Sequence, residues 1–232
     1  MADRIPNGDV DLSRVWIGVA AQVWRREPGP LERFVARLLR SPGLARALLT
    51  TPSLLLPWLI ASVVVLGAGA AATLGTGQPM VALIAPAVAA AGIAYAYGPG
   101  IDPAWELSHS MAVSDRMVLL VRGLAVFAVN TVFGLVASAA SDVAAGIVFE
   151  WLVPMTAVSA LALAAATLSR SANVGVATGV AGWLIIVLAA QAAGGRFATA
   201  VSDSSLLLPY LGFAACCGAL VLYATRMTRG TA

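Results

Sequence analysis

Six long apolar runs, separated by short polar segments, are the feature that most limits how this chain can fold. Of its 232 residues, 60% are hydrophobic and only 11% are charged, whereas a soluble domain usually carries about 25% charged residues. A membrane-spanning helix needs about 20 mostly apolar residues, and the runs lack the two-residue alternation of barrel strands. Backbone groups in lipid must be hydrogen-bonded within the protein, which favours helices. We therefore predict an all-α polytopic membrane protein with six spans, at about 53–74, 80–97, 117–138, 143–169, 174–193 and 206–223.

The arginines predict how these spans are oriented. All fourteen basic residues are arginines, and eight of them precede the first run. If the N-terminus is cytoplasmic, Arg116, Arg170, Arg226 and Arg229 also fall inside, and only Arg196 falls outside. Cytoplasmic loops carry an excess of basic residues. Both ends of the chain are therefore expected in the cytoplasm.

The first 50 residues form a separate segment ahead of the spanning domain, 51–232. Within it, one face of a helix over 31–40 is apolar, and the opposite face carries charges. The apolar positions are Leu31, Phe34, Val35, Leu38 and Leu39, and the charged ones are Glu32, Arg33, Arg37 and Arg40. Arginine-rich amphipathic helices lie in the headgroup plane. The segment is predicted to be an interfacial helix, and a simple topology anchor is the alternative interpretation.

The polar segment between the second and third runs is predicted to contain a short cytoplasmic helix. Asp102 is a suitable N-cap, and Pro103 suits the first helical position because its missing N–H is not needed there. The helix would end near Met111. It would offer apolar contacts to a partner protein, with polar side chains around them. The apolar residues are Trp105, Leu107 and Met111, and the polar ones are Glu106 and His109.

This loop resembles the corresponding region of the ABC-2 type transporter permeases. Members of that family often carry a glutamate–leucine pair, a turn, and then leucines and an arginine that enter the next helix. The matching positions are Glu106, Leu107, Ser114, Leu119, Leu120 and Arg122. The stretch over 150–170 is also similar to the fourth helix of small actinobacterial members. The resemblance covers residues 50 to 228, although the proline common in the turn is missing before Ser114.

The resemblance implies a function in transport. Permeases of this family form homodimers or heterodimers in the bacterial plasma membrane, and each half binds a cytoplasmic ATPase subunit. An interfacial helix before the first span and a coupling helix between spans two and three make those contacts. The ATPase would bind ATP and Mg²⁺, so no cofactor and no nucleic acid is expected on this chain. The expected activity is export of a hydrophobic or amphipathic compound or peptide by alternating access.

Two ionisable residues within the runs are candidates for a gate or pathway. Glu150 lies in the fourth run, and an acid inside a membrane is a functional candidate. The alternative is a structural or interfacial role, in which Glu150 reaches only the outer headgroup region beside Trp151. Arg122 lies just inside the third span, where it could brace the coupling helix through Glu106. The alternative is that Arg122 extends along the lipid to the cytoplasmic interface.

Neutral polar residues inside the spans are further pathway candidates. Asn130, Thr131 and Thr156 lie within the third and fourth runs. Such side chains also commonly form hydrogen bonds between neighbouring helices. Gly175 and Gly179 form a GxxxG pattern that lets another helix approach closely, within the subunit or in a dimer.

The composition argues against enzymes. Without lysine, the chain can form no Schiff base and no lysine-containing phosphate-binding loop. His109 is the only histidine and lies in a cytoplasmic loop, which argues against a serine–histidine intramembrane protease and excludes an HExxH zinc motif. No catalytic residue and no metal site is therefore expected. A membrane anchor or sensor that recruits a cytoplasmic regulator remains the alternative to a transporter.

Overall fold

A computed structural model describes residues 13–18, 29–40, 42, 45, 52–97, 115–140, 150–194 and 199–227. The chain divides into two units, Met1–Arg46 and Ala47–Ala232, which we describe separately.

The first unit contains an amphipathic helix, α2, that spans Pro30–Leu39. Gly29 is its N-cap and Pro30 occupies the first turn, where a proline needs no N–H donor. The helix ends at Arg40, whose φ of 49° closes the last turn. Phe34 and Leu38 are 64% and 72% exposed, so the apolar face is open in this unit. The side chains of Leu31 and Leu39 lie outside the described part of the chain.

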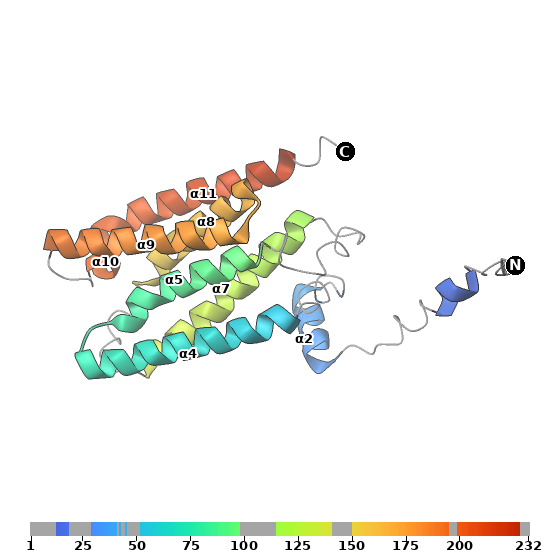
Figure 1. The fold of residues 1–232 in the computed structure, drawn as a ribbon, viewed down its shortest axis with the longest axis horizontal. Coiled ribbons are helices and arrows are strands. Elements are labelled where there is room, and N and C mark those ends of the chain that lie inside the picture. The colour runs from blue at the N-terminus through green and yellow to red at the C-terminus, as the bar shows by residue number, and fades with distance from the viewer. Residues whose placement is uncertain are drawn as a thin grey trace, which may run out of the picture. The chain divides into compact units, whose positions relative to one another are not determined.

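All regular secondary structure in the described residues of the second unit is helical (Figure 1). Its helices are α4 Pro52–Thr76, α5 Met80–Tyr95, α7 Asp115–Ala139, α8 Leu152–Ser169, α9 Ala172–Gly194, α10 Thr199–Ser202, η2 Ser204–Leu206 and α11 Leu207–Met227. The all-helical prediction is confirmed for these residues. Among the described residues, five apolar helical stretches are long enough to cross a membrane: 57–76, 117–139, 152–169, 172–193 and 204–226.

Helix α5 differs from the predicted second span because it is short. Its 16 residues extend for about 24 Å at the usual rise per residue, less than the roughly 30 Å of a bilayer's hydrocarbon core. It contacts α4, α7, α8 and α9 and lies among them (Figure 1). Its core-facing positions are mostly small: Ala82, Ala85, Ala89, Ala90, Gly92 and Ala94. Small residues let neighbouring backbones approach closely, so α5 forms the centre of the bundle.

Helix α8 begins later than the sequence predicts. The fourth run was expected to be helical from residue 143, but the helix begins at Leu152, and residues 141–149 lie outside the described part. Glu150 and Trp151 form a turn before the helix, and Trp151 is fully buried against Gly134. Pro154 therefore lies in the first turn, where proline is tolerated, and does not kink the helix interior.

The GxxxG pattern of α9 is used within the subunit. A Cβ added at Gly175 would lie 2.7 Å from the carbonyl oxygen of Ala162 and 3.0 Å from Cβ of Ala94. One added at Gly179 would lie 2.8 Å from Cβ of Ala162. The two glycines therefore let α9 pack closely against α8 and α5, which assigns the pattern to internal packing and not to a dimer contact.

The turn between α8 and α9 gives a first testable prediction. Arg170 has a φ of 54°, and its N–H and that of Ser171 both donate to the carbonyl of Ala166. This left-handed conformation costs a non-glycine residue roughly 1–2 kcal/mol. We expect Arg170→Gly to be more stable than Arg170→Ala by about 1 kcal/mol in thermal unfolding in detergent. Both variants lose the same charge, so equal stabilities would contradict the strain at this turn.

Candidate functional site

The predicted coupling helix lies outside the described residues. This applies to Asp102, Pro103, Trp105, Glu106, Leu107, His109 and Met111, and also to Ser114. The docking surface and the proposed pairing of Arg122 with Glu106 therefore stay predictions.

The described candidates fall into two places, of which the first is the interior face of α7. Arg122, Val126 and Asn130 follow one another at intervals of four residues and are 8%, 9% and 2% exposed. Residues at this spacing share one side of a helix. Arg122 is therefore covered by protein, which differs from a side chain that extends along the lipid. Ionisable residues in spanning helices usually face the bundle interior in this way.

Asn130 has an unused hydrogen-bonding atom in the interior. Its Nδ2 donates to the carbonyl oxygen of Val126 at 3.0 Å. Its Oδ1 is buried and has no hydrogen-bond partner among the described residues. A buried polar atom without a partner is costly in an apolar environment. Asn130 is thus available to bind a donor group that enters the bundle.

The two candidate threonines are not available in the same way. The hydroxyl of Thr131 donates to the carbonyl of Phe127 at 2.9 Å. That of Thr156 lies 3.0 Å and 2.6 Å from the carbonyl oxygens of Leu152 and Val153. Both hydroxyl protons are therefore used within their own helices, which weakens the case for these residues as pathway donors.

Helix α4 contributes two polar groups that the sequence analysis did not single out. The Nε1 atom of Trp58 and the Oγ atom of Ser62 are buried and, like Oδ1 of Asn130, have no hydrogen-bond partner in the described residues. Ser62 itself is 2% exposed. A serine within an apolar run is common in membrane helices, so the sequence carried no signal that set Ser62 apart.

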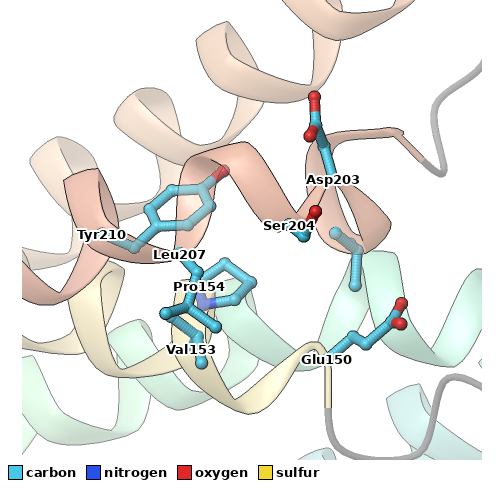
Figure 2. Close-up of a pocket in the computed structure, with 8 residues that line it drawn as sticks. Glu150, Val153, Pro154, Asp203, Ser204, Leu207 and Tyr210 are labelled. Carbon is cyan, nitrogen blue, oxygen red and sulfur yellow. The ribbon is translucent and has the colours of Figure 1, made fainter.

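The second place is a pocket of about 290 Å³ where α8, α10, η2 and α11 meet. It is lined by Glu150, Val153, Pro154, Val201, Asp203, Ser204, Leu207 and Tyr210. Figure 2 shows the apolar residues Val153, Pro154 and Leu207 with Tyr210 on one side, and the polar residues Glu150, Asp203 and Ser204 on the other. By the predicted topology this is the outer end of the bundle.

Two hydrogen bonds stabilise the side of this pocket that α10, η2 and α11 form. The hydroxyl of Tyr210 donates to the carbonyl of Ala200 at 3.0 Å and ties α11 to α10. Asp203 caps η2 and accepts a hydrogen bond from the backbone N–H of Ser205 at 2.9 Å. Hydrogen bonds from the side chain and backbone of Ser205 lower the pKa of Asp203. The side chain of Asp203 is therefore a carboxylate at neutral pH.

The hydrogen bond from Tyr210 to Ala200, which joins α11 to α10, gives a second testable prediction. Tyr210→Phe keeps the ring and removes the hydroxyl that bonds Ala200. Because the freed carbonyl is buried, we expect a loss of about 1 kcal/mol in the free energy of unfolding. Tyr223→Phe is the matched control, since Tyr223 is 60% exposed near the other end of α11. Equal stability of the two variants would show that the bond contributes nothing.

The chemistry of these two places differs. The pocket combines carboxylates with an apolar wall, which suits a cation with an apolar body. Apart from Arg122, the polar groups in the interior of α4 and α7 are neutral hydrogen-bonding atoms, which suit a hydroxyl or amide. Among the described residues, no group of three histidines, cysteines or carboxylates lies close enough to hold a metal ion.

Comparison with known proteins adds no relative. No protein-family model matches the chain, and neither a curated protein nor a solved structure matches it.

Proposed function

We propose that this chain is the membrane subunit of an ATP-binding cassette exporter. It would pair with another permease subunit and bind a separate ATPase at its cytoplasmic side. The ATPase would hold ATP and Mg²⁺, and its closure would drive alternating access in the bundle. The cargo would be a hydrophobic or amphipathic compound or peptide, exported across the bacterial plasma membrane.

The polar interior of α7 is the observation that carries this proposal. An arginine and an asparagine with an unused acceptor are buried on one face of an apolar helix. In spanning helices such residues mark pathways for substrates or ions. A membrane anchor or sensor needs no polar interior, so this face favours transport over the alternative.

Further support comes from the cytoplasmic side of the predicted topology. The amphipathic helix α2 precedes the first spanning helix, as the interfacial helix of the resembling permeases does. Arginines gather on the same predicted side, together with the loop that resembles a coupling helix. With α5 counted as a short sixth span, both termini face the cytoplasm.

Copurification with an ATPase tests the proposal. The chain would be expressed with each tagged candidate ATPase from its own genome, and the recovered complex would be quantified. Trp105→Ala is expected to weaken binding by roughly 30-fold, as truncation of a buried tryptophan anchor at an interface does. Glu106→Ala should weaken it less. Leu208→Ala is the control because Leu208 is 76% exposed and, by the predicted topology, lies on the outer side of the membrane.

Stable copurification that depends on Trp105 and not on Leu208 would support the transporter. A folded, monodisperse chain that retains none of the candidate ATPases would contradict it and favour the anchor or sensor.

A further inference from the structure

We propose that the seam between α4 and α7 holds a water-accessible site that binds a hydroxyl or amide group. The site consists of Trp58 and Ser62 on α4 and Asn130 on α7. In the transporter it would hold a neutral polar group of the cargo, and that role rests on the proposed function. Access of water to the seam does not depend on an ATPase and can be tested separately.

Trp58 of α4 and Val126 of α7 both pack against Gly92 of α5. A Cβ added at Gly92 would lie 2.5 Å from Nε1 of Trp58 and 3.0 Å from Cγ1 of Val126. The side chains of Trp58 and Val126 therefore converge at one level of the bundle, directly over the glycine. Helices α4 and α7 contact each other and run in the same direction, as the colour gradient in Figure 1 shows.

The remaining polar groups lie on the next turn of each helix. Ser62 lies four residues after Trp58, and Asn130 lies four residues after Val126. Residues four apart share a helix face and are separated by about one turn, roughly 6 Å. Because the two helices are parallel in direction, Ser62 and Asn130 lie at the same level. Both are 2% exposed, so both face the interior.

The unused atoms on these two adjacent turns complement one another as a binding site. Nε1 of Trp58 is a donor, Oδ1 of Asn130 is an acceptor, and the hydroxyl of Ser62 can act as either. All three atoms are buried and have no hydrogen-bond partner in the described residues. Buried polar groups are normally satisfied by protein or by ordered water. A group with both a donor and an acceptor, such as water, a hydroxyl or an amide, satisfies this set.

The polar groups are confined to the inner faces of the two helices. On α4, Val63 and Val64 are 54% and 62% exposed, and on α7 Val132 is 55% exposed. These outward positions are apolar and suit contact with lipid. The seam therefore differs in chemistry from the lipid-facing surface of the same helices at nearly the same depth.

Cysteine reactivity distinguishes a hydrated seam from a dry one. Ser62→Cys and Asn130→Cys would be made in the full chain, with Cys216 and Cys217 replaced by alanine. Val64→Cys and Val132→Cys are the matched controls on the lipid-facing sides. In vesicles without any ATPase, the rate of modification by N-ethylmaleimide would be measured by mass spectrometry. The thiolate is the reactive form, and it forms only where water reaches the sulfur.

We expect the two seam positions to react at least roughly tenfold faster than the two controls, because a thiol in apolar surroundings stays protonated and inert. Equally slow reaction at all four positions would overturn the proposal. Ser62→Cys is nearly isosteric, so its rate decides the outcome even if Asn130→Cys fails to fold. A reactive seam in a chain that binds no ATPase would leave the site standing and contradict only the transporter.

Discussion

Gly175→Ala is expected to destabilise the bundle by about 1–3 kcal/mol, the usual cost of overpacking a close contact. The new methyl group would lie 2.7 Å from the carbonyl oxygen of Ala162 and 2.7 Å from Cβ of Ala166. A backbone carbonyl on a neighbouring helix cannot rotate away, so α9 must move from α8. In lipid, close packing of this kind is a main source of helix association.

Gly212→Ala is the matched control for this prediction. Gly212 lies in α11, and no atom lies within 4 Å of the added Cβ position. Alanine there should be neutral or stabilising by up to about 1 kcal/mol, because glycine is the poorer helix former. Thermal unfolding of both variants in detergent provides the comparison. A Gly175→Ala variant as stable as Gly212→Ala would contradict the close packing of α9 on α8.

The second large effect is expected at Trp183, which joins α9 to the central helix. The side chain is 1% exposed, and its Nε1 donates to the carbonyl of Leu83 at 2.6 Å. In α5, Pro86 lacks the N–H that would bond the carbonyl of Ala82, the residue just before Leu83. The indole therefore packs the interface and also adds a hydrogen bond next to the interrupted part of the helix.

Two substitutions separate these contributions of Trp183. Trp183→Ala should lower the free energy of unfolding by about 3 kcal/mol, the lower end for tryptophan truncation. The lower end applies because lipid is as apolar as the interior, so lost packing dominates. Trp183→Phe keeps most of the ring and should cost about 1 kcal/mol through the lost hydrogen bond. Steric trapping in bicelles would measure both, and a loss under 1 kcal/mol for Trp183→Ala would contradict this role.

The positions of the spanning helices could be predicted because the bilayer imposes a length and an apolar composition. The packing of these helices against one another could not be predicted in this way. Hydropathy alone did not distinguish α5 from its neighbours, although its series of alanines is a sign of a central helix. The start of α8 was placed too early because the apolar run continues through residues that come before the helix. Trp151, the N-cap residue of α8, is buried against Gly134 of α7, and hydropathy does not reveal such a contact.

The candidate site was predictable only in part, for the same reason. Glu150 and Asn130 could be found because a polar group in an apolar run is conspicuous. The residues that come with them could not be found in this way, since Asp203 reaches the pocket from a distant segment and Ser62 is buried on another helix. The GxxxG pattern of α9 predicted a close helix contact, but only the structure shows that α8 and α5 supply it.

Reconstitution tests the central claim most directly. The chain and the ATPase that copurifies with it would be incorporated into lipid vesicles, and ATP hydrolysis would be measured with and without the chain. Our account predicts hydrolysis that rises when the chain is present and falls again with Trp105→Ala. Hydrolysis at the same rate with the chain, without it and with the variant would contradict a transporter subunit.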